Sequence, residues 1–159
     1  LGLLSLVEGK SEDGLSFLER AVDKGSSNPV VHYHYARALL DANPKAGEIP
    51  EPVRAKASAS LLKTLEADPS HAEAARLFGF LRLFDGSAQE GVDVVKKALE
   101  GSPENFYLWF VLGQLYGRQE NYSASRAIYE DLMTRKLDPG FVAEVRRQLD
   151  WVVAKTGSP

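Results

Sequence analysis

Two histidines separated by one residue are the first candidates for chemistry in this sequence. His32 and His34 form a His-x-His pair, and imidazole is a common metal ligand. Residues two apart on a helix point to different sides, so this pair could not share an ion if the segment is helical. The chain has no cysteine and no His-Glu-x-x-His spacing to complete such a site. We therefore predict neither a metal site nor a cofactor.

The acidic residues do not form a candidate catalytic pair either. Glu12, Asp13 and Glu51 lie near expected helix starts, where a carboxylate stabilises the helix dipole. The sequence has no Gly-x-Ser-x-Gly motif and no glycine-rich loop after a strand, so the usual nucleophile and phosphate sites are missing. His71 follows a Pro-Ser turn, where a polar role at a helix start is expected. We predict that the chain is not an enzyme.

The composition is that of a folded, water-soluble chain. Its 159 residues are 44% hydrophobic and 26% charged, and the net charge is −3. A slightly acidic chain gives no electrostatic reason to bind nucleic acid. No apolar run approaches the roughly 18 residues that a membrane-spanning helix needs. The absence of cysteine leaves the compartment undecided between cytoplasm and periplasm.

Equivalent residues recur at one interval along the chain. Small residues and prolines are 34 apart in three cases: Gly2 to Ala36 (36 − 2), Pro69 to Pro103 (103 − 69) and Gly79 to Gly113 (113 − 79). The interval from Ala36 to Gly79 is 43, which is 34 plus nine. An insertion of nine residues within one unit explains this interval. A fixed period of this length is typical of helical repeat proteins.

The last unit carries the most specific motif, Trp109-x-x-Leu112-Gly113-x-x-Tyr116, followed by Ser125-x-x-x-Tyr129. In-phase matches in the other units are Leu1-Gly2 with Gly14-x-x-x-Leu18, Tyr35-Ala36 with Ala57-x-x-x-Leu61, and Phe78-Gly79 with Gly91-x-x-x-Val95. These residues resemble the signature of the tetratricopeptide repeat (TPR) family over nearly the whole chain. Small residues are expected where the two helices of a pair approach most closely.

The resemblance implies an all-α fold, an α-solenoid of about four stacked helix-turn-helix repeats in a right-handed superhelix. The units are expected at residues 1–28, 29–71, 72–105 and 106–138, with a C-terminal capping helix at 139–157. Individual helices are predicted over residues 1–8, 11–24, 29–42, 51–67, 70–84, 88–100, 104–119, 122–135 and 139–155. Pro29, Pro52 and Pro139 are predicted at first helical positions.

Two segments depart from the repeat. Residues 43–51 contain two prolines and a glycine, so we predict a loop insertion there, functional or merely tolerated. Apolar residues at helical spacing after Asp138 predict the capping helix, which covers the exposed end of the stack: Phe141, Val142, Val145, Leu149 and Val152. The chain begins with Leu1 in an expected helix, so we expect it to be a piece of a longer protein.

In TPR proteins the first helix of each unit lines a concave groove. Carried over to this chain, the resemblance implies peptide-binding groove positions at Tyr33, Arg37, Arg76, Phe80, Phe84, Tyr107, Phe110, Gln114 and Arg118. Arginine and tyrosine are frequent at binding hot spots, and the cations would suit an acidic and apolar peptide. The alternative is that some aromatic rings pack between units while the arginines pair with neighbouring carboxylates.

The chain departs from well-known TPR patterns in two respects. Tyr33, Arg37, Arg76 and Leu77 do not reproduce the Lys and Asn set of carboxylate-clamp TPR domains. Arg82 stands where the family usually has a bulky apolar residue, and we expect its stem to pack while its head reaches solvent.

Three functions are compatible with these features. The preferred one is a protein-protein interaction scaffold without catalytic activity. The alternatives are an accessory structural region that packs against another domain of a larger enzyme or secretion or assembly protein, and a homo-oligomerisation module.

Overall fold

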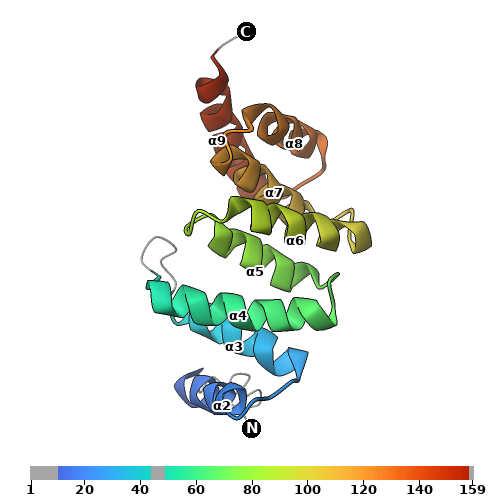
Figure 1. Cartoon of the computed structure of the whole chain (residues 1–159). Helices are drawn as coiled ribbons and strands as arrows, with labels where there is room; N and C mark the ends of the chain where they lie inside the picture. The colour runs from blue at the N-terminus through green and yellow to red at the C-terminus, as the bar shows by residue number, and fades with distance from the viewer. Residues whose placement is uncertain (1–10, 44–48, 158–159) are drawn as a thin grey trace. The chain divides into compact units, whose positions relative to one another are not determined.

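The computed structural model describes residues 11–43 and 49–157 of the chain. Within these ranges every regular element is an α-helix. The helices are α2 (Ser11–Asp23), α3 (Pro29–Asp41), α4 (Glu51–Ala67), α5 (Ala72–Arg82), α6 (Ala88–Gly101), α7 (Phe106–Arg118), α8 (Tyr122–Thr134) and α9 (Pro139–Thr156), shown in Figure 1. The all-helical prediction is confirmed. The helix predicted over residues 1–8, the motif residues Leu1 and Gly2, and most of the 43–51 insertion lie outside the described residues.

Side-chain caps explain where the helices begin. Asn28, Asn105, Asn121 and Asp138 each accept a hydrogen bond from a backbone N–H in the first turn of the following helix, at 2.9–3.3 Å. Pro29 and Pro139 are the first residues of their helices, as predicted. α4 begins at Glu51, as predicted, so Pro52 is its second residue and not its first. One of the first backbone donors of each helix, which has no partner within the helix, thus finds one that the sequence provides locally.

The described residues fall in two compact units, Leu1–Ala74 and Ala75–Pro159. In the first unit α3 packs against both α2 and α4. Its core contains Leu18, Tyr35 and Leu61, each at most 3% exposed. The two small residues predicted at close helix approaches, Ala36 and Ala57, are fully buried.

Polar side chains also hold the helices of the first unit together. His32 is buried, with Nε2 2.7 Å from the Ser26 carbonyl oxygen and Nδ1 3.4 Å from the Ser60 hydroxyl. On α4, Thr64 donates a hydrogen bond of 3.2 Å to the Pro29 carbonyl. These contacts give His32 of the His-x-His pair a structural role, because both of its ring nitrogens lie against polar groups of the first unit.

A second polar link joins α2, α3 and α4. The Tyr35 hydroxyl donates to Glu19 Oε1 at 3.2 Å, and Lys56 Nζ lies 2.9 Å from the same oxygen. The bonds from Lys56 and then from Tyr35 lower the pKa of Glu19 below its ordinary 4.5. Burial is the main cause of the raised pKa of Tyr35. α2 is therefore connected to α3 and α4 through one carboxylate.

Glycines set the helix contacts of the second unit, where α7 packs against α6, α8 and α9. A Cβ atom on Gly79 would lie 2.7 Å from Val95, one on Gly91 2.8 Å from Leu115, and one on Gly113 2.7 Å from Tyr129. Real Cβ atoms do not approach so closely, so the backbone needs glycine at these sites. The prediction of small residues at helix contacts is confirmed here.

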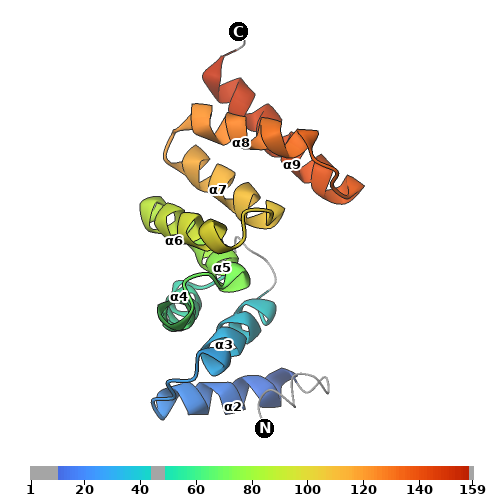
Figure 2. The ribbon, with the colours of Figure 1, turned by 90° about the vertical axis from the view of Figure 1, so that its right-hand side faces the viewer.

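The last helix covers the apolar surface of α7 and α8. Its Val145 and Val152 are fully buried beside Tyr129 and Leu132, and Phe141 and Leu149 pack against this cluster. Trp151 adds a contact that the sequence motifs did not predict, since its ring would lie 3.1 Å from a Cβ on Gly117. α9 thus contacts both helices of the preceding pair, as Figure 2 illustrates for α8.

The opposite side of α9 is polar. The four positions 34 residues after Trp109, Leu112, Gly113 and Tyr116 are occupied by Ala143, Arg146, Arg147 and Asp150. All four are exposed. On α7 the four motif positions hold Trp109, Leu112, Gly113 and Tyr116. The equivalent positions on α9 hold one alanine and three charged residues.

Candidate partner-binding surface

In the first unit the predicted positions Tyr33 and Arg37 lie beside two histidines. The Tyr33 ring contacts the rings of His34 and His71, with centroids 5.1 Å and 4.8 Å away. His71 Nδ1 also accepts a hydrogen bond of 3.2 Å from the Ala74 N–H, which gives it the expected role at a helix start. Three rings from α3 and the start of α5 therefore form one partly exposed cluster.

Arg37 is the exposed cation of this cluster. Its side chain is 57% exposed, and Nε lies 3.6 Å from an Asp41 carboxylate oxygen. A hydrogen bond with Tyr33 is the main cause of its raised pKa. Burial, followed by the charge of Arg37, lowers the pKa of His34. The cluster therefore presents the Arg37 guanidinium, with Asp41 beside it, next to aromatic surface.

On α5 the predicted positions are largely covered. Phe80 and Phe84 contact each other edge to face, with ring centroids 5.1 Å apart, and both are half-buried. Arg76 is half-buried and engaged by a neighbouring group. The two phenylalanines bury much of their apolar surface within the second unit.

On α7 the predicted residues differ in exposure. Phe110 packs against Tyr129 and Phe141, with centroids 5.8 Å and 5.3 Å away, so it belongs to the core contact with α9. Tyr107 also contacts Phe141, at 4.8 Å, yet it is 54% exposed. Tyr107 is therefore the aromatic residue of this helix that offers a large accessible surface.

Gln114 and Arg118 follow Tyr107 along the same side of α7, because residues seven and eleven apart return to one face of a helix. Gln114 is half-buried, and Arg118 is exposed in the last turn, where a cation suits the helix dipole. Arg118 makes no ion pair with any residue that the structure describes. A free guanidinium and an exposed phenol thus lie on one rigid element.

The repeat interval identifies further residues of this face that the sequence reasoning missed. Phe141, Glu144 and Gln148 on α9 stand 34 residues after Tyr107, Phe110 and Gln114. Gln148 Nε2 donates to Glu144 Oε1 at 3.4 Å, and Glu144 also pairs with Arg147. The same spacing that located the glycines would have located these three positions, had the capping helix been included in the repeat count.

Comparison with solved structures decides the fold. A crystal structure of MamA superimposes on 99% of this chain and 79% of its own, with a TM-score of 0.78 and 16% identity. A tetratricopeptide repeat protein from Parabacteroides merdae ATCC 43184 matches 98% of this chain with a TM-score of 0.75 and 19% identity. This chain has the TPR fold.

The likeness lies in structure and not in sequence. A MamA fragment from Desulfovibrio magneticus RS-1 gives a TM-score of 0.75 at 17% identity, over 98% of this chain and 81% of that one. The chain spans 57% of the Parabacteroides TPR protein. No family model matches the sequence. No curated protein sequence matches it either.

Arg82 is more covered than a solvated arginine at this position of the TPR fold would be. Its side chain is only 12% exposed, although its hydrogen bond to Asp85 lies at the surface. The guanidinium pairs with Asp85 and lies 2.9 Å from Glu90, and its carbon is 4.4 Å from the centroid of the Phe78 ring. Two carboxylates close by make it possible to bury a cation at a position that is usually apolar in the family.

The described part of the chain lacks two other classes of feature. Residues 11–43 and 49–157 contain no cluster of three or more His, Asp or Glu side chains that could hold a metal ion. In the same ranges, no helix combines the length and apolar character required to cross a lipid bilayer.

Proposed function

We propose that this chain is a non-enzymatic scaffold that binds a peptide or partner protein through the groove-facing residues of its TPR helices. The observation that carries the proposal is the side of α7 with an exposed Tyr107 and with Arg118, which is exposed and makes no ion pair among the described residues. Tyrosine and arginine contribute strongly to binding when a partner covers them. The helix that carries them packs against α6, α8 and α9, so binding costs little conformational entropy of the backbone.

The chemistry of this face favours an acidic and apolar partner. An acidic side chain would meet Arg118, and an apolar one would cover the Tyr107 ring. In the first unit the Tyr33 and Arg37 cluster repeats the same combination. The proposed binding residues are those predicted from the sequence, with Tyr107 and Arg118 as the strongest contributors in the second unit.

The test uses partner capture by the purified chain. Partners retained from a native lysate are identified by mass spectrometry, and the strongest is then titrated by calorimetry against Tyr107→Ala/Arg118→Glu. We expect the double substitution to abolish binding and to leave the helical circular dichroism unchanged, because both side chains are exposed. Phe110→Ala would be a poor choice, because Phe110 packs in the core contact with α9.

The matched control is Lys96→Glu, which reverses an exposed charge on α6 and touches no predicted groove position. It should bind the partner normally. Undiminished binding by the double variant would refute the groove assignment. A mass measurement across a range of concentrations separates binding of a foreign partner from self-association.

A further inference from the structure

A pocket in the second unit lies away from the proposed groove. Its volume is ≈ 360 Å³, and it lies between the first turns of α7 and the last turns of α8. Phe106, Trp109 and Ile128 supply apolar surface, and Glu104, Asp131 and Arg135 supply charges. Trp109 points to the other side of α7 from Tyr107, since two residues turn an α-helix by about 200°. The pocket is thus separate from the groove residues of the same helix.

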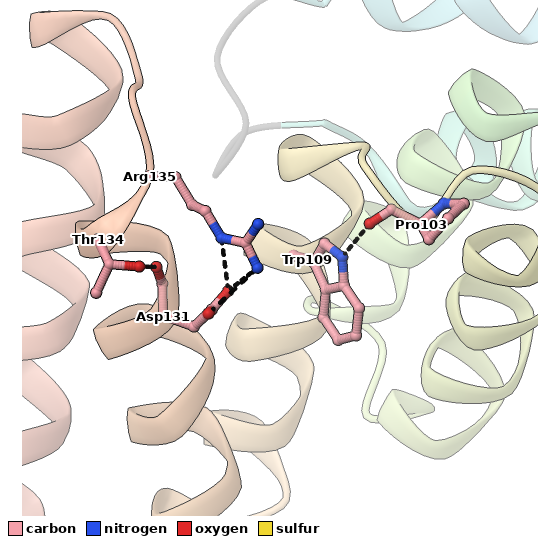
Figure 3. A network of polar contacts seen from close by, with 5 residues as sticks. All are labelled: Pro103, Trp109, Asp131, Thr134 and Arg135. Carbon is pink, nitrogen blue, oxygen red and sulfur yellow. Dashed lines mark hydrogen bonds and ion pairs between the residues drawn. The ribbon is translucent and has the colours of Figure 1, made fainter.

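The walls of this pocket are held in place before any ligand arrives. Trp109 Nε1 donates a hydrogen bond of 2.8 Å to the Pro103 carbonyl, which fixes the plane of the indole (Figure 3). Across from it, Arg135 makes a two-pronged contact with Asp131 at 3.1–3.3 Å. The Thr134 hydroxyl bonds to the Asp131 carbonyl at 2.7 Å. A ligand would therefore lose little affinity to ordering these side chains.

The charges around the pocket indicate what it would accept. Arg135 and Asp131 neutralise each other, whereas Glu104 has no ion-pair partner among the described residues. The end of α8 adds the partial negative charge of its last carbonyl groups. The net field at the rim is therefore negative, while the floor is apolar. A side chain that fills the floor should be followed by a cation.

We propose that this pocket is a docking site for a partner segment in which an apolar residue such as leucine precedes a lysine or arginine. The leucine side chain lies against Trp109 and Ile128. The cation reaches Glu104. This occupant differs in charge from the acidic partner of the groove, so the two faces of α7 select different ligands.

The chain provides its own probe for this proposal. It has two tryptophans, Trp109 in the pocket and Trp151 on α9, so a ¹⁵N-¹H spectrum contains two indole signals. A Trp151→Phe variant assigns them. The ligand is the acetylated, amidated tetrapeptide Gly-Leu-Lys-Gly, titrated into the full chain. We expect a saturable shift of the Trp109 signal with the Trp151 signal unmoved.

Two comparison peptides test the chemistry of the occupant. Replacing leucine by alanine should weaken binding by about tenfold or more, the effect of losing a buried aliphatic group. Replacing lysine by glutamate should weaken it by about threefold, the effect of an exposed ion pair. In the Glu104→Gln chain this preference for lysine should disappear while the leucine peptides still bind.

A filled-pocket variant completes the test. Ala127 is exposed at the rim, so Ala127→Phe should block the pocket without opening a cavity, and Ala59→Phe on α4 is the control. Loss of the Trp109 shift in Ala127→Phe alone supports the proposal. No shift in the unmodified chain, equal shifts of both indoles, or equal binding of all three peptides would overturn it. Tyr107→Ala/Arg118→Glu should bind the tetrapeptide normally, so failure here and failure of the groove are distinguishable.

Discussion

The two compact units build similar helix contacts from different chemistry. Four of the five buried polar side chains in the described residues, His32, Ser58, Ser60 and Thr64, belong to the first unit. The second unit contains one, Ser125, and brings its helices together through Gly79, Gly91 and Gly113 against aliphatic and aromatic side chains. Directional hydrogen bonds specify the first set of contacts, and close packing specifies the second.

The difference shows what a repeat position requires. The residue of the first unit that is equivalent to Gly113 in the repeat is Ala36, which is fully buried and carries a Cβ. The Tyr129 ring rules out that Cβ in the second unit, because the ring lies directly on Gly113. Burial also raises the pKa of Tyr129, as expected for a phenol inside the core. The fold thus requires a small residue, and the neighbouring ring decides whether it must be glycine.

The largest expected effect tests whether close packing specifies the helix contacts of the second unit. Tyr129→Ala should lower the free energy of unfolding by about 3–5 kcal/mol, because it removes a fully buried ring and leaves a cavity. Tyr107→Ala is the control, since that ring is 54% exposed. Denaturant titration followed by circular dichroism measures both. Equal losses for the two tyrosines would contradict the packing account.

A smaller effect is expected from removing a buried hydrogen-bonding side chain of the first unit. His32→Leu should cost about 1–3 kcal/mol, because it removes the partner of the Ser26 carbonyl and of the Ser60 hydroxyl within a buried site. His34→Leu is the matched control, because His34 is partly exposed and lies against the Tyr33 ring. The same denaturant titration applies. If the His32 variant were as stable as its parent, the claim that hydrogen bonds specify the helix contacts of the first unit would be wrong.

The smallest expected effect is the loss of stability at low pH that follows protonation of Glu19. The folded state lowers the pKa of Glu19, so its contribution to stability is present above pH 4.5 and is lost as the pH falls through the lowered value. Since the pair with Lys56 is substantially exposed, the contribution is below about 1 kcal/mol. Glu19→Gln should flatten this part of the stability profile.

Much of the fold was predictable because its determinants are local. Asparagine and aspartate caps, prolines and a repeated glycine mark helix ends and contacts in the sequence itself, and Gly79 and Gly113 lie where the repeat interval predicts. The burial of Arg82 was not predictable in this way. It depends on Asp85 and Glu90 reaching the same guanidinium, which is a matter of side-chain placement across a turn.

The candidate sites were less predictable for a similar reason. Helix phase placed Tyr107 and Phe110 on one face, yet it could not show that Phe110 packs against Tyr129 and Phe141 while Tyr107 stays accessible. The pocket beside Trp109 joins two helices through side-chain positions, and no motif encodes that combination. The repeat signature identified Trp109 as a structural residue and gave no indication of the space beside it.

The polar outward side of α9 has a consequence for protein engineering. Any helix added against Ala143, Arg146, Arg147 and Asp150 would have to remove water from two guanidinium groups and a carboxylate. Such a surface resists both extension of the solenoid and end-to-end stacking of separate molecules. A designer who wants a further helix to pack on this side of α9 would first place tryptophan, leucine, glycine and tyrosine at these four positions.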